Sequence, residues 1–391
     1  MRPLEGVVVL SLEQAVAVPY ATRLLADLGA RVIKVERPGA GDFARAYDSS
    51  CGEVSSYFAW TNVGKESLAV DLKAPEGAAV IAALVARADV VMCNLSPGAA
   101  RRLRLDPESL RAAHPKLIAA ELSSYGEGGP YSDRKAFDAL VQSETGLIAA
   151  TGDGEVVARA GISVADIAAG VQLHAAVLAA LVRRGRTGEG ATLRLTLMEA
   201  LAEWMHQPAL YAFGTGQAPE RHGSHHPTIA PYGVFTCADG TVHLAVQNDG
   251  QWRRLCAVLD PALAEDPRFD TVSGRVDHRA ELHARLQPRL DARTTDFLVA
   301  ALDAADVPVA RTRSVAELRD HPQLTSRGRW AEVAVPGGSV PMLRPPVDAD
   351  AWTWDPAAVP ALGAHTEAVL DWLGYPAAAI ADLRSRGVVG A

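Results

Sequence analysis

The stretch VVVLSLEQAVAVPYATRLLADLGARVIKVE, residues 7–36, contains a complete strand–helix–strand unit. Its first six residues are rich in β-branched side chains, which is typical of a strand buried on both faces of a parallel sheet. Apolar residues then recur at helical spacing over residues 20–28, with Pro19 in the first turn and Gly29 at the end. A second β-branched run follows over residues 31–36. We therefore expect two parallel strands that are joined by a helix.

This alternation continues to about residue 200. The further segments with a regular pattern are helix 76–87, strand 88–95, strand 117–122, helix 167–183, strand 191–197 and helix 198–213. Strands that alternate with helices indicate a parallel sheet covered by helices on both faces. Because crossover connections are right-handed, we predict an α/β fold with a doubly wound parallel sheet.

The pattern changes after residue 213. Residues 214–231 are rich in Gly and Pro and contain three histidines, so we interpret them as a linker or an active-site loop. Beyond them, Asp239-Gly240 is a strong turn signal between two alternating runs, and helical patterns follow. We predict that residues 1–213 belong to a large domain and that residues 232–325 form a small α+β domain.

The composition limits the classes of function. The chain has 391 residues, of which 49% are hydrophobic, and this length suggests about two or three domains. Its 46 acidic and 38 basic residues give a net charge of −8, which argues against nucleic acid as the main partner.

The cysteines and the apolar segments indicate a location. Four scattered cysteines without a CxxC pair favour a reducing compartment. The first residues show no signal-peptide pattern, and the longest apolar helical run, Val171 to Val182, is too short to cross a bilayer. We predict a cytoplasmic protein without a membrane partner.

Common catalytic signatures are missing from the sequence. It has no GxGxxG or GxxxxGK[ST] phosphate loop, no HExxH zinc motif and no GxSxG nucleophile elbow. His222, His225 and His226 lie close together, but their spacing matches no standard metal site. We predict neither a bound metal nor a prosthetic group.

Asp166 stands at the start of the predicted apolar helix 167–183. An aspartate there can simply cap the helix by accepting hydrogen bonds from free backbone amides. The helix dipole also favours an ionised, nucleophilic carboxylate, and free amides can hold an oxyanion. The pattern alone leaves both interpretations open.

Basic residues near the predicted strand ends are similarly ambiguous. They either hold a polyphosphate beyond the sheet or are solvated surface charges. They are Lys73, Arg101, Arg102, Arg104 and Lys135.

Several motifs resemble one known family when they are taken in order. They are DLGARVIKVERPGAGD (27–42), TNVGKESLAVDLK (61–73), NLSPG (94–98) with Arg102, YGEGGPY (125–131), GISVADIAAG (161–170), RTGEG (186–190), PYGVF (231–235), DG (239–240), QW (251–252), DPRF (266–269) and VP (307–308). Together they resemble the class III CoA-transferases, the CaiB/BaiF family that includes formyl-CoA transferase and carnitine CoA-transferase. The resemblance covers nearly the whole chain.

This resemblance implies a fold and an assembly. It implies a large Rossmann-like domain formed by both chain ends, residues 1–213 and 326–391, with the small domain between them. It also implies a homodimer in which the two chains are interlocked.

The resemblance also implies a nucleophile and a co-substrate. Asp166 matches the family's catalytic aspartate, which attacks an acyl-CoA thioester and then carries CoA itself as a thioester. The positions that match the family's CoA contacts are Arg37, Leu72, Lys73, Asn94, Arg102 and Lys135. Coenzyme A thioester is therefore the expected co-substrate, and a carboxylic acid is the expected acceptor.

Departures from the family pattern narrow the reaction. The racemase branch of the family has a histidine immediately before the aspartate that matches Asp138, whereas this chain has Phe137, which carries no proton. Val16 replaces a glutamine of formyl-CoA transferase, and the loop from His222 to His226 replaces its glycine-rich lid. We therefore do not expect formate or oxalate as substrates.

The acid is expected to be dicarboxylic. His225, His226 and the nearby Arg221 are candidates to meet a second carboxylate, as in succinate, mesaconate or itaconate. Three alternatives remain open: a racemase-type isomerase, intramolecular CoA transfer within one dicarboxylyl-CoA, and a CoA-binding homologue without catalysis.

Overall fold

The computed structural model describes residues 1–390, and the chain divides into two compact units. The first unit comprises Met1–Thr145, Gly161–His206 and Leu324–Ala391. The second comprises Gly146–Ala160 and Gln207–Gln323. Each unit has a hydrophobic core of its own.

The first unit is built on a seven-stranded sheet in the order β14-β3-β2-β1-β4-β5-β8. Its strands are β1 (Val8–Leu12), β2 (Arg31–Glu36), β3 (Lys65–Val70), β4 (Val90–Cys93), β5 (Ile118–Ser123), β8 (Ala191–Thr196) and β14 (Val389–Gly390). All neighbouring strands are parallel except β14, which is antiparallel to β3. The predicted α/β class with a mainly parallel sheet is therefore confirmed. The strand order reverses at β1 and β4, and such switch points are where open α/β sheets bind ligands.

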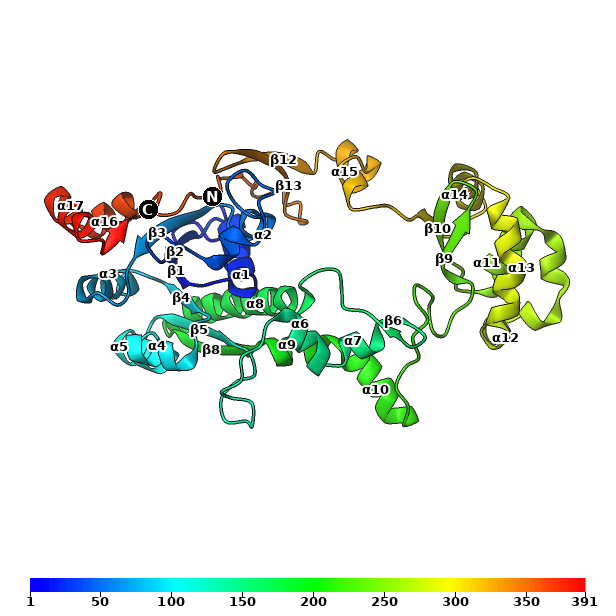
Figure 1. The fold of residues 1–391 in the computed structure, drawn as a ribbon, viewed down its shortest axis with the longest axis horizontal. Coiled ribbons are helices and arrows are strands. Elements are labelled where there is room, and N and C mark those ends of the chain that lie inside the picture. The colour runs from blue at the N-terminus through cyan, green and yellow to red at the C-terminus, as the bar shows by residue number, and fades with distance from the viewer. Residues whose placement is uncertain (391) are drawn as a thin grey trace. The chain divides into compact units, whose positions relative to one another are not determined.

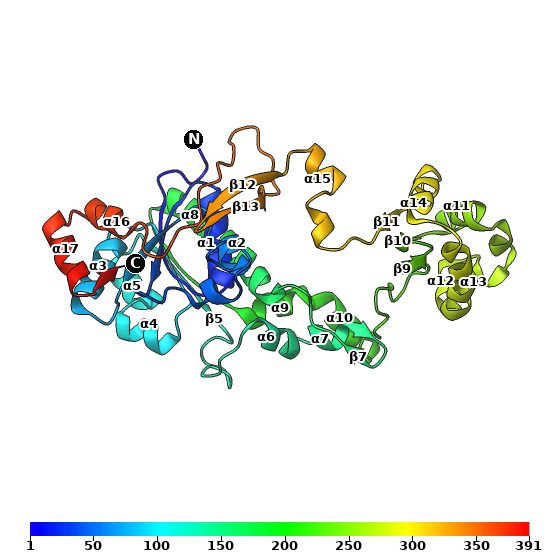
Figure 2. The same ribbon diagram turned by 45° about the horizontal axis from the view of Figure 1, so that its top comes forward.

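Helices cover both faces of this sheet (Figures 1 and 2). One layer consists of α3 (Pro75–Val85), α4 (Pro97–Leu103), α5 (Pro107–Ala113), α16 (Thr366–Leu373) and α17 (Ala377–Ser385). Leucine, isoleucine and valine side chains from these helices pack against those of the strands. The opposite layer contains α1 (Ala17–Asp27) and α8 (Val164–Thr187).

Helix α8 crosses α1 at very short range. A Cβ atom on Gly170 would lie 2.9 Å from the carbonyl oxygen of Ala17 and 2.9 Å from the Tyr20 ring, so the crossing requires glycine. With 24 residues, α8 is the one helix within residues 1–390 that is long and apolar enough to cross a membrane. The prediction that this apolar run is too short was therefore wrong. Its packing against α1, α9 (Leu197–Trp204), β5 and β8 nevertheless makes α8 a core helix of this unit.

Smaller elements complete the first unit. They are the 3-10 turn η1 (Phe43–Ala46), α2 (Ser56–Thr61), α6 (Asp138–Glu144), α9 (Leu197–Trp204), β12 (Trp330–Val335) and β13 (Gly338–Leu343). Strands β12 and β13 pair as a hairpin, whose Val333 and Val335 pack with Phe58 of α2 in a separate apolar cluster.

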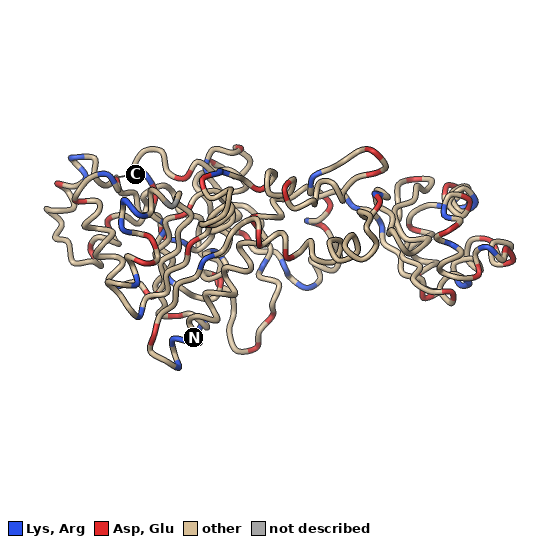
Figure 3. The backbone as a smooth tube through the Cα atoms, turned by 90° about the horizontal axis from the view of Figure 1, so that it is seen from below, with Lys and Arg blue, Asp and Glu red and all other residues tan. Residues whose placement is uncertain are grey.

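The second unit contains a three-stranded antiparallel sheet in the order β11-β10-β9. Its strands are β9 (Tyr232–Cys237), β10 (Gly240–Ala245) and β11 (Val309–Arg311). The helical elements are α7 (Leu147–Ala150), α10 (His206–Thr215), α11 (Asp249–Leu259), η2 (Pro261–Glu265), η3 (Pro267–Phe269), α12 (Val272–Asp277), α13 (Arg279–Asp291), α14 (Thr295–Ala304) and η4 (Ala316–Leu318). A short hairpin of β6 (Gly152–Asp153) and β7 (Val156–Val157) belongs to this unit, and α15 (Pro322–Ser326) lies at its boundary. Basic and acidic residues are interspersed along the backbone of both units, in keeping with the small net charge (Figure 3).

The predicted helix 198–213 is in fact two helices, α9 and α10. Pro208 explains the interruption because proline has no backbone N–H and its ring clashes with the carbonyl group four residues earlier. That carbonyl belongs to Trp204, the last residue of α9.

Candidate active site

The first turn of α8 carries Asp166 as its third residue. The N-cap residue Ser163 makes no side-chain capping bond, and Asp138 of α6 takes that role instead. Oδ1 of Asp138 accepts hydrogen bonds from the amides of Ala165 (2.7 Å) and Asp166 (3.3 Å). Oδ2 of Asp138 accepts a hydrogen bond from Nε2 of Gln142 (2.6 Å). The two aspartates, which are 28 residues apart in the chain, therefore meet at one helix end.

Asp166 itself is a half-buried and weakly stabilised carboxylate. Its side chain accepts no hydrogen bond within residues 1–390. Burial, and secondly the negative charge of Asp138, raise the pKa of Asp166 to about 7. Such a carboxylate is ionised in part at neutral pH and is more basic than an ordinary aspartate.

Tyr47 lies close enough to Asp166 to be affected by its charge. Burial first, and then the charges of Asp42 and Asp166, raise the pKa of the Tyr47 phenol to about 12. The Tyr47 ring contacts Tyr57 edge-on at 5.5 Å between centroids and Phe43 at 5.7 Å. These three rings form a partly exposed aromatic cluster, of which Tyr47 is the member within range of the carboxylate.

A pocket of about 300 Å³ opens beyond the carboxyl ends of β1, β2 and β3. Its lining residues are Leu12, Glu13, Gln14, Val35, Glu36, Arg37, Gly41, Asp42, Val70, Asp71, Leu72, Lys73, Leu95, Ala99, Arg102 and Leu103. Four of the six predicted CoA contacts are among them: Arg37, Leu72, Lys73 and Arg102.

The other two predicted contacts lie outside the lining. Asn94 exchanges two hydrogen bonds with the backbone of Gln14, at 3.0 and 2.9 Å, and thereby holds one wall of the pocket. Lys135 is an exposed residue of the loop between β5 and α6 and does not line the pocket.

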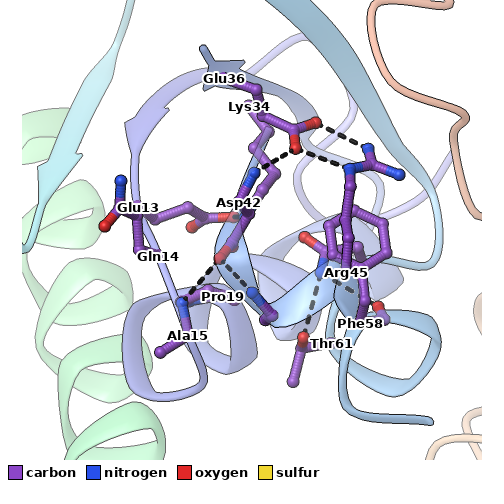
Figure 4. A network of polar contacts seen from close by, with 12 residues as sticks. Glu13, Gln14, Ala15, Pro19, Lys34, Glu36, Asp42, Arg45, Phe58 and Thr61 are labelled. Atoms are coloured by element: carbon purple, nitrogen blue, oxygen red, sulfur yellow. Dashed lines mark hydrogen bonds and ion pairs between the residues drawn. The ribbon is translucent and has the colours of Figure 1, made fainter. Parts of the chain in front are cut away.

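A buried ionic network supports the floor of this pocket (Figure 4). Glu13 accepts hydrogen bonds from Nζ of Lys65 at 2.6 Å and of Lys34 at 3.4 Å. Lys34 also donates to Asp42 at 2.7 Å, and Asp42 accepts from the amide of Ala15 at 3.2 Å. Burial favours the neutral acid of Glu13, but the two lysines outweigh it and lower the pKa of Glu13 to about 2. The lysine and acid charges therefore compensate each other inside the protein.

A second pair continues the network toward the solvent. Arg45 donates to both oxygens of Glu36 at 2.8 Å, and Glu36 also accepts from the hydroxyl of Ser67 and the amide of Asp42. Burial opposes ionisation of Glu36, yet the bond to Arg45 holds its pKa below the usual value. With these acids paired, the remaining charged side chains of the lining are three cations, Arg37, Lys73 and Arg102, and one acid, Asp71. The Asp71 carboxylate accepts a hydrogen bond from the amide of Lys73.

A comparison with known families assigns the chain as a whole. The model of CoA-transferase family III matches residues 4–366. The chain belongs to this family. It is an enzyme of the family III CoA-transferase type.

Individual relatives support the assignment over most of their length. The chain is 38% identical to a succinate–glutarate CoA-transferase of Agrobacterium fabrum over 88% of this chain and 89% of that protein. It is 35% identical to an acetyl-CoA:oxalate CoA-transferase of Acetobacter aceti over 86% and 88%. The crystal structure of a CAIB/BAIF family protein from Brucella suis is similar with a TM-score of 0.87 and 34% identity, covering 95% of this chain and 99% of that one.

The remaining residues predicted near the substrate have these places. Val16 is buried at the start of α1, and Phe137 is 64% exposed immediately before Asp138. His225 and His226 belong to the second unit, where His225 contacts Phe235 and His283, and His226 stacks on Tyr232. Within residues 1–390, no group of three or more His, Cys, Asp or Glu side chains is arranged to hold a metal ion.

Sequence reasoning missed Tyr47, Gln142 and the ionic network. In the sequence, Lys34 and Lys65 stand out only as two of the five lysines. A usable signal existed, because Lys34 stands inside a strand expected to be buried on both faces, where a charge needs a partner.

Proposed function

We propose that the enzyme transfers CoA from an acyl-CoA to a carboxylic acid, with Asp166 as the covalent nucleophile. The observation that carries this proposal is the Asp166 carboxylate itself, at a helix start, without a hydrogen-bond partner within residues 1–390 and with a pKa raised to about 7. Membership of the CoA-transferase family supports it.

The reaction consists of four exchanges of a carboxylate and a thiolate. An oxygen of Asp166 attacks the thioester carbonyl, the C–S bond breaks with its electron pair on CoA thiolate, and a mixed anhydride forms. The thiolate then attacks the Asp166 carbonyl carbon, the C–O bond breaks, and the donor acid leaves as a carboxylate. The aspartyl-CoA thioester that remains is attacked by the acceptor carboxylate, which releases thiolate and forms a second anhydride.

In the last exchange the thiolate attacks the acceptor's carbonyl carbon and restores the Asp166 carboxylate. No step gains or loses a proton, so the chemistry needs no general acid. It does need protection of the anhydrides and the thioester from water. Asp166 is already half-buried in the chain alone, which supports such protection.

The pocket beside Asp42 is proposed to bind coenzyme A. Arg37, Lys73 and Arg102 are cations on its wall, suited to the phosphates of a nucleotide. The apolar part of the lining, including Leu72 and Leu103, suits the adenine and the pantetheine arm. Lys135 is proposed to join these cations when CoA is bound.

A dicarboxylic acid is the proposed acceptor. The names of the two relatives above include succinate, glutarate and oxalate. Oxalate, which was not expected from the sequence, is therefore one of the acids to be tested. Arg221 is less available than expected, because it donates to the carbonyl oxygens of Gly154 and Ala149. Nδ1 of His226 accepts from the amide of Thr228, which leaves Nε2 as the donor that we propose for a second carboxylate.

A homodimer of interlocked chains in the cytoplasm is the proposed assembly. Apolar side chains on α10 support a second copy of the chain as the partner, because none of the residues of α10 is buried and Phe213 is 80% exposed. Light scattering of the purified protein should give twice the chain mass of 41.2 kDa.

Racemisation is a weaker candidate for two reasons. It needs two proton carriers, and Phe137 replaces one of them. Asp138 is an unsuitable substitute because three donors already bond its carboxylate. A chiral 2-methylacyl-CoA incubated in deuterated water should therefore take up no deuterium at the α carbon.

The proposed function is tested by trapping the covalent enzyme. Enzyme incubated with acyl-CoA and then treated with borohydride or hydroxylamine should carry the modification on the peptide that contains Asp166. Asp166→Asn should bind CoA as the wild type does but show no turnover and no trapping. Modification of a different carboxylate, or normal turnover in the variant, would refute the mechanism. A screen of free acids against succinyl-CoA and acetyl-CoA, read by mass spectrometry, identifies the acceptor. It also distinguishes CoA transfer between two molecules from CoA transfer within one dicarboxylyl-CoA.

A further inference from the structure

The start of α8 is capped by a carboxylate from another helix. An N-cap side chain normally satisfies the first free amides of a helix, but Ser163 does not do so here. Asp138 of α6 takes the amides of Ala165 and Asp166 instead. This external cap is therefore a tertiary contact that fixes the position of the α8 start.

The cap is itself held in place. Gln142, one turn further along α6, donates from Nε2 to the second oxygen of Asp138 at 2.6 Å, and Gln142 is completely buried. One oxygen of Asp138 is thus committed to α8 and the other to Gln142. The Asp138 carboxylate has little freedom to turn toward solvent or substrate.

Because of the external cap, two different aspartates satisfy the helix amides and supply the reactive carboxylate. Asp166 is the third residue of α8, a position where a carboxylate is favoured by the helix dipole and by free amides. Hydrogen bonds from amides to a carboxylate stabilise its ionised form and make it less basic. Because Asp138 occupies these amides, Asp166 remains free of such bonds.

We propose that Asp138 is a positioning residue, held by Gln142, that caps α8 from outside and keeps the Asp166 carboxylate fixed but unstabilised for attack. This inference deepens the proposed CoA transfer and depends on it. Asp138 does not touch the reacting atoms in this role and acts only through α8 and through its charge.

The charged groups around α8 support the role that the hydrogen bonds indicate for Asp138. Other titratable or charged groups on the elements packed against α8 are Tyr20, Arg23 and Asp27 on α1, Glu144 on α6, Glu199 and Glu203 on α9, Glu121 on β5 and Arg194 on β8. Tyr47 also lies within range of Asp166. Burial and the charge of Asp138 raise the pKa of Asp166 to about 7. A raised pKa makes the ionised carboxylate more nucleophilic, and it removes that form as the pH falls below 7.

The test is Asp138→Asn, which preserves shape and removes only the charge. Its side-chain oxygen still accepts from both amides, and a rotated Gln142 amide accepts from its nitrogen. We expect the acid limb of the pH–rate profile for acyl-enzyme formation to move down by about one pH unit. The plateau rate at high pH should fall several-fold because the nucleophile is less basic. An acid limb at the wild-type pH would overturn the inference.

Glu189→Gln is the matched control. It removes one carboxylate just beyond the opposite end of the same helix. From Asp166 to Thr187, the last residue of α8, the helix is about 32 Å long at 1.5 Å per residue. It should leave the profile unchanged. Thermal unfolding of each variant shows whether the fold is retained.

A second variant tests the positioning role without touching the cap. Gln142→Met removes the donor that holds Asp138 and should lower the plateau rate several-fold while the KM for acyl-CoA stays constant. A wild-type rate in this variant would contradict the role of Gln142. If wild-type enzyme forms no acyl-enzyme at Asp166, the proposed function fails; if it does and the Asp138→Asn profile is unmoved, only this inference fails.

Discussion

Nζ of Lys65 donates to Oε1 of Glu13 at 2.6 Å, and both side chains are completely buried. The same nitrogen also donates to the carbonyl oxygen of Pro19 and to Asn62. Burial lowers the pKa of Lys65 to about 7, although the charge of Glu13 opposes this shift. Three acceptors match the three protons of an ammonium group, so this geometry favours the charged lysine up to about neutral pH. The pair therefore ties α1, β1 and β3 together beneath the pocket.

Glu13→Gln should destabilise the protein strongly. The substitution leaves Lys65 and Lys34 buried without a full counter-charge, and breaking a buried ion pair costs about 3–5 kcal/mol. Urea denaturation measures this loss of unfolding free energy. The double variant Glu13→Gln with Lys65→Met should recover part of the lost unfolding free energy. The control is Glu189→Gln, which breaks the exposed ion pair with Arg183 and should reduce the unfolding free energy far less. A loss as small as that of the exposed pair would show that the buried pair contributes little.

The pH dependence of stability should report Glu13. Its pKa is lowered from 4.5 to about 2 in the folded protein, so the unfolded chain binds the proton more readily. The stabilisation is complete above pH 4.5 and is lost as the pH falls toward 2. The difference in unfolding free energy between wild type and Glu13→Gln should therefore shrink over this interval. A difference that stays constant from neutral pH down to the folded pKa would contradict the lowered value.

Asp166→Asn should stabilise the protein at alkaline pH. Because the pKa of Asp166 is raised from 3.8 to about 7, the fold opposes its ionisation, and this cost appears as the pH rises through that range. The melting temperature of the variant should exceed that of the wild type at about pH 8 and approach it at about pH 4. Equal melting temperatures at both pH values would mean that the carboxylate is not destabilised by its surroundings.

The cations of the pocket should control the affinity for acyl-CoA. Arg102→Ala and Lys73→Ala should each raise the KM for acyl-CoA about tenfold, with little change in kcat, because a charge-assisted bond to phosphate is lost. Arg104→Gly is the control: Arg104 ends α4 in a left-handed conformation that glycine adopts easily, and it does not line the pocket. Steady-state kinetics at low and high salt distinguish the three variants. Equal KM values in all of them would place the nucleotide elsewhere.

Two glycines of α8 should respond in opposite directions to alanine. Gly170→Ala forces a Cβ atom to within 2.9 Å of the Ala17 carbonyl oxygen, so the helices must separate, at a cost of about 1–3 kcal/mol. Gly185→Ala meets nothing within 4 Å and should stabilise the helix by about 0.5–1 kcal/mol. Thermal unfolding measures both effects. Activity should fall only in Gly170→Ala, because the crossing sets the position of Asp166.

The strands of the sheet were predictable because their pattern is local. The runs at 7–12, 31–36 and 117–122 are confirmed as β1, β2 and β5, each within one residue at either end. The helix predicted over 167–183 extends to Val164–Thr187. Its first turn was not visible in the pattern because the residues that satisfy it come from α6.

The relationships that make the site were not predictable in the same way. The Asp138 cap joins residues 28 apart, and the bond from Lys65 to Glu13 joins residues 52 apart. No periodicity encodes such pairs, since they arise from how helices and strands pack. The hairpin of β12 and β13 was not predicted either, because Pro341 lacks a backbone N–H and weakens the strand signal of the second strand.

The close crossing of α1 and α8 has a consequence for the evolution and redesign of this enzyme. The reactive carboxylate is carried by a rigid scaffold element, so surrounding surface loops can change length and chemistry without displacing it. A library that varies only those loops should therefore yield altered acid preferences while the rate of the first acyl exchange persists. Variation at Gly170, in contrast, would lower the activity of every member of such a library, because it displaces the helix that carries Asp166.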